Sequence, residues 1–423
     1  MLTKAPRGTK DILPAEVPQW RFFEEKAREA CRLFGYSEIR TPIFEHTELF
    51  LRGVGEATDI VAKEMYTFTD KGGRSLTLRP EGTASVARAY LEHKMQGEAQ
   101  PVKVFYTGPM FRYDRPQAGR YRQFHQFGVE AFGSQEPALD AEVIMLALFF
   151  LQSLGLDNLA LHLNSVGCPE CRSRYRETLV AALRDGVKQL CPDCSERYEK
   201  NPLRILDCKN ERCQAVTKGV PLLADELCNG CREHFAAVRA VLDALDVAYV
   251  LDPRLVRGLD YYTKTAFEIM ASGLGAQSSI CGGGRYDHLL ATIGGPDIPG
   301  IGFAIGIERV LLALAAAGAG EAAVPVPDVF VATAGVTPAE VLPYVMELRK
   351  AGLAAEMDFL NRSLKAQLKF ADKKGIRYVV LLGEAELQAG QATVKDMQSG
   401  VQEAVALGGL CAYLAERLKE ENQ

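Results

Sequence analysis

The sequence predicts an α+β domain with a mixed, mainly antiparallel sheet and a small Cys-rich, mainly helical insertion, followed by a separate C-terminal α/β domain. Three observations support this fold class. The chain has 423 residues, more than one core of usual size accommodates. Strand-like alternation recurs at irregular intervals before residue 310, whereas strands and helices alternate after residue 328. Eight of the eleven cysteines lie between Cys168 and Cys231.

The individual elements follow from hydrophobic periodicity. Apolar residues recur at helical spacing over 18–34, and Gly35 is suited to end that helix. In the first domain, alternation predicts strands at 37–40, 75–78, 102–106, 123–131, 266–270 and 302–307. In the second domain we expect strands at 329–333, 354–359 and 378–382, and helices at 338–351 and 363–374.

Composition sets the domain boundaries. The stretch 315–327 is rich in alanine, glycine and proline, which is typical of a linker. We therefore expect one domain over 1–325, with the cysteine-rich insertion at about 168–240, and a second domain over 328–423.

Charge and hydropathy exclude several classes of protein. The net charge is −5, so contact with nucleic acid would need local basic patches. The longest apolar run, 143–151, is too short to cross a membrane, and the N-terminus is too polar for a signal peptide. We expect a cytoplasmic protein whose cysteines are reduced, so that clustered cysteines indicate metal rather than disulfides.

The segment LVRGLDYY, residues 255–262, places an arginine and two phenols in an apolar stretch. A guanidinium is almost never buried without an anion, so Arg257 requires an anionic partner. The ordinary alternative is a local carboxylate such as Asp260. Tyr261 and Tyr262 add two polar aromatic groups beside it.

A second candidate is the hairpin over 107–130, which carries Arg112, Arg115, Arg120 and Arg122. Such a hairpin can present cations to a polyanion, although charge runs are often only solvated loops. If the following strand alternates, Gln126 and Glu130 share the face opposite Phe127 and Val129. That face would form the floor of a small-molecule site.

Two further segments end strands with polar residues. In TLRPEGT, 77–83, Glu81 and Thr83 suit an ammonium group, although the same side chains could simply cap a helix that starts near Ala84. In GIGFAIGIERVLLAL, 300–314, Arg309 lies where a strand runs into a helix. The glycines of that segment miss the G-x-G-x-x-G spacing, which excludes a dinucleotide-binding turn.

Together these segments resemble the class II aminoacyl-tRNA synthetases, and specifically the bacterial-type histidyl-tRNA synthetase family. Residues 35–45, 107–130 and 300–314 are similar to the three motifs of the class, the first of which builds a dimer interface. LVRGLDYY and SSICGGGRYD, 278–287, resemble two stretches peculiar to the histidine enzymes. The resemblance covers nearly the whole chain and implies a class II synthetase-like catalytic domain, a C-terminal anticodon-binding domain and a homodimer.

The resemblance also implies an activity. A histidine–tRNA ligase activates L-histidine with ATP and Mg²⁺ to histidyl-adenylate and pyrophosphate, then transfers histidine to the 3′ end of tRNA(His). Arg112 would hold the α-phosphate and Arg309 the γ-phosphate, while Arg257 would lie beside the α-phosphate and the histidine carboxylate. The histidine site would comprise Glu81, Gly82, Thr83, Arg112, Gln126, Glu130, Arg257, Tyr261 and Tyr262. The last two and Glu130 would face the imidazole, and the remaining polar groups would face the amino group and carboxylate.

Basic residues of both domains are candidates for contact with tRNA. Lys365, Lys369 and Lys373 recur every four residues on an expected helix of the second domain, opposite Leu364 and Leu368. A basic face suits phosphates, although a lone one is more often simply solvated. In the first domain the candidates are Arg115 and Arg120 of the hairpin.

The cysteines of the insertion have the spacing of metal ligands. Two C-x2-C pairs, Cys168 with Cys171 and Cys191 with Cys194, fall within the spacing of a zinc site. A second set of thiolates could come from Cys208, Cys213, Cys228 and Cys231. We expect one or two structural Zn²⁺ ions, although the sequence does not decide which pairs share an ion. The alternative is free cysteines in a small helical insertion.

Two other functions have specific sequence requirements. A regulatory paralogue of histidine biosynthesis would share the synthetase-like domain without aminoacylation, but such proteins characteristically lack the anticodon domain. A zinc-ribbon nucleic-acid module would explain the cysteines, but it would not explain the other residues of the chain, about 350, which are far more than such a module requires. The full C-terminal domain argues against the first, and the size of the chain argues against the second.

Overall fold

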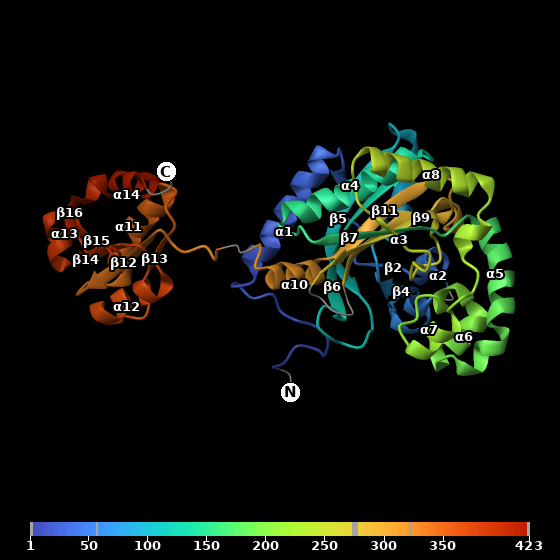
Figure 1. Ribbon diagram of the computed structural model, residues 1–423. Coiled ribbons are helices and arrows are strands. Elements are labelled where there is room, and N and C mark those ends of the chain that lie inside the picture. The colour runs from blue at the N-terminus through green and yellow to red at the C-terminus, as the bar shows by residue number, and fades with distance from the viewer. Residues whose placement is uncertain (1–2, 56–57, 273–277, 321–322, 421–423) are drawn as a thin grey trace. The chain divides into compact units, whose positions relative to one another are not determined.

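The structure is a computed structural model that describes residues 3–55, 58–272, 278–320 and 323–420. The chain divides into two compact units, Met1–Ala322 and Ala323–Gln423 (Figure 1). Residues 321 and 322 of the expected linker lie outside the described residues. Among the helices that are described, none is both long and apolar enough to cross a membrane.

The N-terminal unit is built on an eight-stranded sheet with the order β1-β5-β6-β11-β10-β9-β7-β8. Two pairs at its edges, β1 with β5 and β7 with β8, are parallel, and the other neighbours are antiparallel. This confirms a mixed, mainly antiparallel sheet. The strands are β1 (Ser37–Glu38), β5 (Val102–Phe111), β6 (Gln123–Phe132), β7 (Leu159–Ser165), β8 (Val250–Leu251), β9 (Thr263–Ala271), β10 (Ser279–Arg285) and β11 (Gly300–Gly306).

Helices α1 (Val17–Leu33), α4 (Pro137–Ser153) and α10 (Ile307–Ala317) cover one face of this sheet, and α3 (Thr83–Glu92) and the insertion cover part of the other face, where the site lies. The main core joins α1, α4 and α10 to the strand residues Phe127 and Phe303 (Figure 1). Its aromatic centre is edge-to-face, with the rings of Phe127 and Phe150 4.9 Å apart. Gly35 follows α1 with φ +77°, as its expected role at the end of that helix requires.

A smaller three-stranded sheet lies in the same unit, with the order β2-β4-β3. Its members are β2 (Phe44–His46), β3 (Tyr66–Thr69) and β4 (Ser75–Leu78), accompanied by α2 (Thr47–Val54), the π-helix η1 (Ile60–Glu64) and α3 (Thr83–Glu92). The expected strand at 75–78 therefore exists but belongs to this second sheet. Phe44 and Phe68 pack against each other and remain 50% and 44% exposed.

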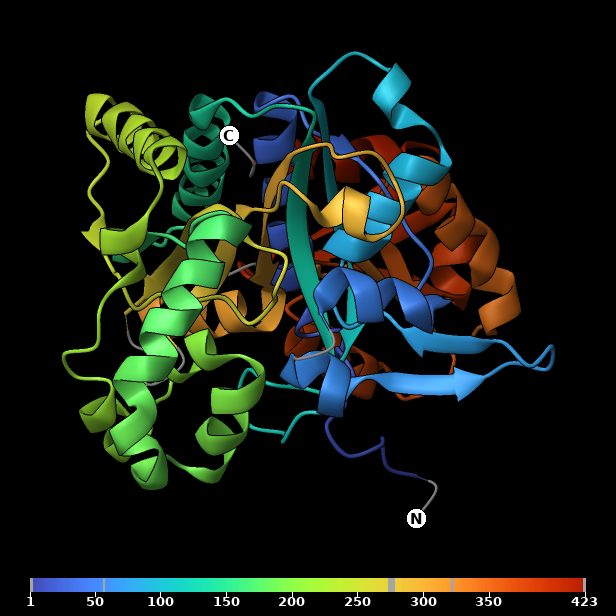
Figure 2. The same cartoon turned by 90° about the vertical axis from the view of Figure 1, so that its right-hand side faces the viewer.

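The cysteine-rich insertion is mainly helical, as expected. It consists of α5 (Pro169–Leu183), α6 (Pro192–Lys200), α7 (Glu211–Val216) and α8 (Asn229–Ala244), joined by the short 3₁₀ turns η3 (Arg184–Gln189), η4 (Pro202–Ile205) and η5 (Leu223–Glu226). Figure 2 shows the green helices of this segment gathered together beside the sheet. Its apolar side chains share one core with the strands and with Val256 and Tyr262.

The C-terminal unit is an α/β domain with the sheet order β13-β12-β14-β15-β16. The expected strands are present as β12 (Val329–Ala334), β13 (Ala355–Met357) and β14 (Tyr378–Gly383), all parallel. The expected helices are α11 (Pro338–Lys350) and α12 (Leu364–Lys374). The antiparallel strands β15 (Gln391–Asp396) and β16 (Gln402–Ala406), and the helices α13 (Glu384–Ala389) and α14 (Leu410–Glu420), complete the unit.

Candidate functional site

A cavity of about 490 Å³ lies in the N-terminal unit, where the eight-stranded sheet meets loop 255–262 and the insertion. Nine of the residues proposed from the sequence line it: Glu81, Thr83, Arg112, Arg120, Gln126, Arg257, Tyr261, Tyr262 and Arg309. Gly82, Arg115 and Glu130 do not line the cavity, and the three lysines belong to the other unit. Residues distant in sequence thus converge on one polar cavity.

Beneath the cavity lies a hydrogen-bonded polar group centred on Glu130, which is 1% exposed. The Thr83 hydroxyl donates to Glu130 Oε1 at 2.7 Å, and the Tyr286 hydroxyl donates to Glu130 Oε2. Glu130 therefore lies directly behind two lining residues. Phe127 and Val129 point into the core on the opposite face, so β6 alternates as expected.

Glu81 combines the two roles considered from the sequence. Its carboxylate accepts hydrogen bonds from the backbone N–H groups of Thr83 and Ala84, both at 2.8 Å, and so caps α3. The same side chain lines the cavity. Burial raises the pKa of Glu81, which the two backbone hydrogen bonds partly offset.

Aromatic side chains shape the wall beside this polar group. The rings of Tyr261 and Tyr262 lie 4.8 Å apart, and Tyr261 meets Tyr286 edge-to-face at 5.6 Å. Tyr106 fills the space behind them, and a Cβ atom at Gly82 would lie 2.2 Å from its ring. Gly82 therefore serves the site by making room for Tyr106.

Two partly buried arginines, Arg112 and Arg309, line the cavity and donate to backbone carbonyls rather than to carboxylates. Arg112 Nε donates to the carbonyl of Pro80 at 2.8 Å, and Arg309 Nη1 donates to the carbonyl of Ser279 at 3.0 Å. Within the described residues neither forms a salt bridge. Burial lowers the pKa of both guanidinium groups, and the nearby Arg120 and Arg112 lower that of Arg309 further. This arrangement favours a multiply charged anion between them.

Arg257 is paired with a carboxylate, but not with that of Asp260. It pairs with Glu268 of β9, whereas Asp260 accepts a hydrogen bond from Asn201 at 2.7 Å, so the local pairing considered from the sequence is wrong. Burial would lower the pKa of Arg257, but Glu268 raises it above its ordinary value. A Cβ atom at Gly282 would lie 2.0 Å from Arg257 Nη2, so glycine is required there. Glycine at this position of β10 thus leaves room for the guanidinium.

We expect Glu130→Gln to change how stability depends on pH. Burial is the main reason that the pKa of Glu130 rises from 4.5 to about 8. Between these values the folded protein holds a proton that the unfolded chain has lost, so stability falls as pH rises through that window. The glutamine variant has no carboxyl group to titrate at this position, so it does not lose this stability. Its unfolding free energy relative to the parent protein should therefore increase by roughly 3 to 4 kcal/mol from about pH 5 to pH 8.

Chemical denaturation of the ligand-free proteins at several pH values measures this difference. Replacing the Glu130 carboxyl group by the amide of glutamine also disturbs the hydrogen bonds with Thr83 and Tyr286. The resulting loss of stability is independent of pH in this range. A difference that stays constant from about pH 5 to pH 8 would contradict the raised pKa.

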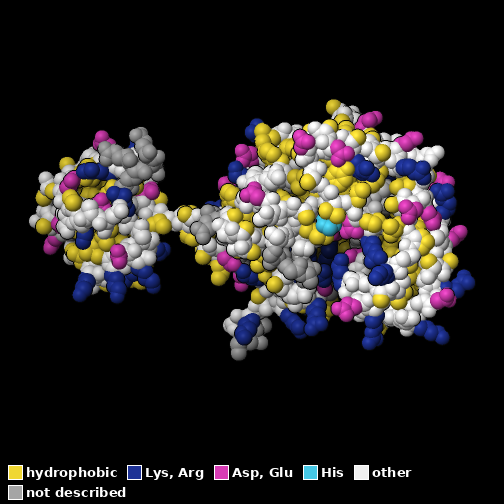
Figure 3. All heavy atoms as spheres, viewed as in Figure 1, with side chains coloured by type: hydrophobic (Ala, Val, Ile, Leu, Met, Phe, Trp, Pro, Cys, Tyr) yellow, Lys and Arg dark blue, Asp and Glu magenta, His cyan; other side chains and the backbone are white. Residues whose placement is uncertain are grey.

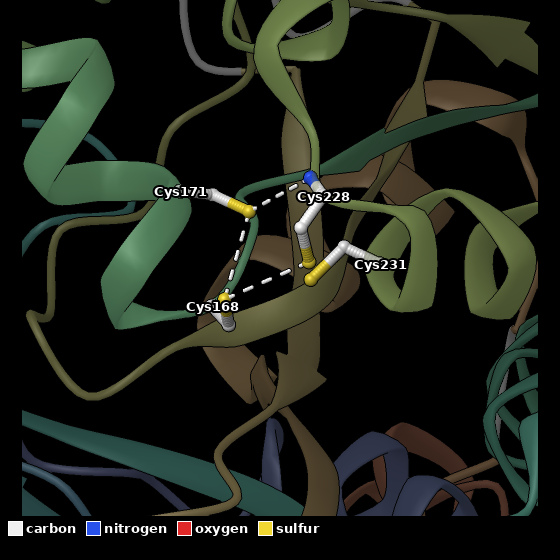
Figure 4. A group of neighbouring side chains, drawn as sticks. All are labelled: Cys168, Cys171, Cys228 and Cys231. Atoms are coloured by element: carbon white, nitrogen blue, oxygen red, sulfur yellow. Dashed lines mark hydrogen bonds between the residues drawn. The ribbon is translucent and has the colours of Figure 1, made fainter.

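The eight cysteines of the insertion form two groups of four, in each of which the sulfur atoms lie within 4.8 Å of one another. The first group is Cys168, Cys171, Cys228 and Cys231, at the starts of α5 and α8, and Figure 4 shows its side chains turned toward one another. The second group is Cys191, Cys194, Cys208 and Cys213. The sequence leaves the pairing open, and the structure groups Cys168 and Cys171 with Cys228 and Cys231 rather than with Cys191 and Cys194. All eight thiols are free of disulfides.

Sequence reasoning missed several residues of the cavity. Glu268, Tyr286, Asp59, Arg197, Arg204 and Asp207 all line it, and Tyr106 supports it. Tyr286 lies in the conspicuous segment SSICGGGRYD, 278–287, so the sequence contains a signal for it, whereas Glu268 lies in an expected strand and carries none. The arginines of the insertion had no such signal, because their contacts with the site depend on tertiary structure.

Comparison with known proteins places these features in a family. The histidyl-tRNA synthetase family model matches residues 8–310, and the anticodon binding domain model matches residues 328–417. A histidine–tRNA ligase from Desulforamulus reducens is 58% identical over 99% of this chain and 100% of the relative. Another, from Pelotomaculum thermopropionicum, is 56% identical over 100% of both. The crystal structure of apo histidyl-tRNA synthetase from S. aureus superposes with a TM-score of 0.81 at 43% identity, covering 97% of this chain and 99% of that one.

Proposed function

Because the chain belongs to the histidyl-tRNA synthetase family and is a histidine–tRNA ligase, we propose how its residues divide the work of activating histidine. The observation that carries the proposal is the convergence of Arg112, Arg257 and Arg309 on one cavity that is also lined by Glu81 and Gln126. The three cations suit a triphosphate and a carboxylate, and the polar side chains of the same cavity suit an ammonium and an imidazole.

The histidine end of the cavity is assigned to Glu81, Thr83 and Gln126 for the amino group, with Gly82 shaping the wall. Gln126 Oε1 is buried and has no hydrogen-bond partner among the described residues, which supports a ligand donor there. Tyr261 and Tyr262, with Glu130 behind Thr83 and Tyr286, are assigned to the imidazole. A site that must hydrogen-bond its substrate rejects apolar mimics strongly.

The nucleotide end is assigned to Arg112 at the α-phosphate and Arg309 at the γ-phosphate. Arg257 lies between the two ends and stabilises the charge that develops as the histidine carboxylate attacks phosphorus. Mg²⁺ would accompany ATP, and Glu268 and Glu308 offer carboxylate oxygens in the same cavity, the ligand type that this ion prefers. The protein's own contribution is to position the two substrates and neutralise charge.

Histidine-dependent exchange of pyrophosphate into ATP tests the activation step without tRNA. The expected result is exchange that requires both histidine and Mg²⁺ and is not supported by phenylalanine at comparable concentration. No exchange by folded protein would defeat the proposed assignment of the cavity.

We propose that the C-terminal unit binds the anticodon region of tRNA(His), with Arg115 and Arg120 of the catalytic unit as further tRNA contacts. Its match to an anticodon binding domain supports this assignment and argues against a regulatory paralogue. Lys365, Lys369 and Lys373 are exposed on α12, while Leu364 and Leu368 pack inward. Figure 3 shows Lys and Arg side chains gathered along the edge of the unit where Figure 1 labels α12.

The double variant Lys365→Ala with Lys369→Ala should raise KM for tRNA about 30-fold, since two phosphate contacts of about 1 kcal/mol each are lost. Pyrophosphate exchange should remain at the parent level, because this step does not involve tRNA. The control is Lys350→Ala with Lys419→Ala, which removes two exposed lysines of the same unit from α11 and α14. Equal KM values in the two double variants would show that α12 makes no contact with tRNA.

We also propose a homodimer in the cytoplasm. The exposed Ile43 and Phe44 lie in the segment that resembles the dimer-building motif, and Phe68 extends the same apolar surface. The eleven free cysteines are consistent with a reducing compartment. Light scattering of the purified protein should give twice the mass of one chain.

Each four-cysteine group is proposed to bind one Zn²⁺. A tetrahedron with Zn–S bonds of about 2.3 Å has S···S edges of about 3.8 Å. The structure has Cys168–Cys171 at 3.5 Å, Cys168–Cys228 at 4.0 Å and Cys191–Cys208 at 3.9 Å between sulfur atoms, so the thiols fit the ion. Metal analysis should find two zinc ions per chain.

A further inference from the structure

The second cysteine group closes a segment of chain on itself. Segment 191–213 begins with Cys191 and Cys194 and ends with Cys208 and Cys213. The sulfur atoms of these four residues lie within 4.8 Å of one another. Between them run α6 and the 3₁₀ turn η4, joined at Asn201. A metal bound by these four cysteines would hold the base of the segment, while its outer part extends toward the cavity.

The outer part contacts loop 255–262, which carries Arg257 and Tyr261. Arg204 Nη1 donates to the carbonyl of Gly258 at 2.9 Å, and Asn201 Nδ2 donates to Asp260 Oδ1 at 2.7 Å. These two bonds hold the loop on either side of Leu259, between Arg257 and Tyr261. The loop forms no helix or strand over 255–262, so its position depends on such contacts. Further ones run from Arg172 Nη1 to the Asp260 carbonyl at 3.1 Å and from the Asp260 N–H to the Val54 carbonyl at 3.2 Å.

The same segment also contacts the opposite wall. Arg197 Nη2 and Arg204 Nη2 lie 2.7 Å and 3.5 Å from Asp59 Oδ2. Asp59 immediately precedes η1, whose residues Ile60 and Glu64 line the cavity. Segment 191–213 therefore bridges two walls of one site.

These contacts are partly desolvated, which strengthens them. The side chains of Arg197 and Arg204 are 24% and 17% exposed, and both line the cavity. Leu259 and Tyr261 pack into the same apolar cluster as Cys194 and Cys213. Because segment 191–213 and loop 255–262 share hydrogen bonds and one apolar core, a displacement of the segment should also move the loop.

We propose that segment 191–213, closed by Zn²⁺ at Cys191, Cys194, Cys208 and Cys213, positions the histidine-binding loop, with Asn201 and Arg204 as positioning residues. The inference rests on the proposed assignment of Arg257 and Tyr261 to histidine and of zinc to the second group. Its consequence is that metal in this group controls affinity for histidine as well as the fold of the insertion.

Asn201→Ala and Arg204→Ala in the full chain test the positioning role. Each should raise KM for histidine about 10-fold in pyrophosphate exchange, while KM for ATP changes less than about twofold and zinc content stays at two ions per chain. Arg204→Lys keeps a donor for the Gly258 carbonyl and should restore part of the loss. The controls are Arg184→Ala and Arg212→Ala, which remove exposed arginines of the same insertion and should match the parent protein. An unchanged KM for histidine in both test variants would overturn the proposal.

Cys208→Ser tests the role of the metal. Zinc should fall from two ions to one, and KM for histidine should rise as in the Asn201 variant. Adding Asn201→Ala to Cys208→Ser should then have little further effect, because both changes release the same contact. Cys208→His retains a zinc ligand and should keep both metal and affinity. Loss of zinc with a normal KM for histidine, or fully additive effects, would overturn the coupling.

An error in the positioning role of Asn201 and Arg204 and an error in the assignment of the cavity give different experimental results. If the parent protein shows histidine-dependent exchange and the Asn201 and Arg204 variants equal it, only the positioning role is wrong. If the parent protein shows no exchange, the assignment of the cavity is wrong. If Cys208→Ser does not fold, the Asn201 and Arg204 variants, which leave all cysteines intact, still decide the positioning role.

Discussion

Replacement of Arg257 by alanine should slow histidyl-adenylate formation about 10³-fold while histidine still binds. The guanidinium lies between the proposed sites for ATP and for histidine, beside the ring of Tyr262 at 5.6 Å. Negative charge grows at this point when the carboxylate attacks phosphorus, so the interaction is strongest in the transition state. Pyrophosphate exchange measures the loss, and calorimetric titration with histidine measures the remaining affinity.

The variant also leaves Glu268 without its cation, and a partly buried unpaired carboxylate destabilises a fold. A second variant, Arg257→Ala with Glu268→Gln, removes that charge and should recover thermal stability without recovering exchange. The control is Arg21→Ala, which removes an exposed arginine from α1. Near-normal exchange in Arg257→Ala would show that the assigned role is wrong.

The elements that periodicity predicts best are those with one apolar face. The helix at 18–34 is found as α1 over Val17–Leu33, because Phe23, Ala27 and Ala30 form a buried stripe. The parallel strands of the C-terminal unit were likewise predicted from short apolar runs. The expected strand at 37–40 shrinks to Ser37–Glu38, since only these two residues pair with β5.

The central strand β10 shows why part of the sheet could not be predicted. Its sequence SICGGGR contains three successive glycines, a composition that disfavours a strand. Those glycines are required by close packing: a Cβ atom at Gly283 would lie 2.5 Å from the carbonyl of Gly302 in β11. A local propensity is therefore overridden by contacts that exist only in the folded sheet.

Prediction of the site depended on what each side chain needs. Arg257 required an anion wherever it was buried, and the alternation of β6 placed Gln126 and Glu130 on one face. Glu268 carried no comparable signal, because a glutamate in a strand is ordinarily solvent-facing. Its role appears only once β9 lies beneath Arg257.

The cysteine groups show the same limit. Spacing alone groups neighbours in sequence, whereas the structure nests one pairing inside the other, with the second group between the two halves of the first. This topology follows from the packing of α5 to α8 around a shared core, which the spacing of cysteines does not encode.

Arg112→Ala should lower kcat for pyrophosphate exchange by about 10² to 10³-fold. The Arg112 guanidinium is anchored through Nε to the Pro80 carbonyl at 2.8 Å and lies over the Phe124 ring at 5.2 Å, which leaves its remaining donors for an anion. Arg112→Lys should restore little, because an ammonium cannot form the planar, two-pronged contact with phosphate oxygens. Single-turnover formation of adenylate separates this effect from binding of ATP.

Arg309→Ala is the informative comparison. Its guanidinium is held by the carbonyls of Gly119 and Ser279 at the far end of the cavity, where the γ-phosphate is proposed to lie. It should therefore raise KM for ATP about 10-fold with a smaller effect on kcat, since its contact forms in the ground state as well. If the Arg112 variant changed only KM for ATP and the Arg309 variant changed only kcat, the two phosphate assignments would have to be exchanged. The different responses thus test the orientation of ATP in the cavity, because different backbone carbonyls hold the two guanidinium groups: Pro80 holds Arg112, and Gly119 and Ser279 hold Arg309.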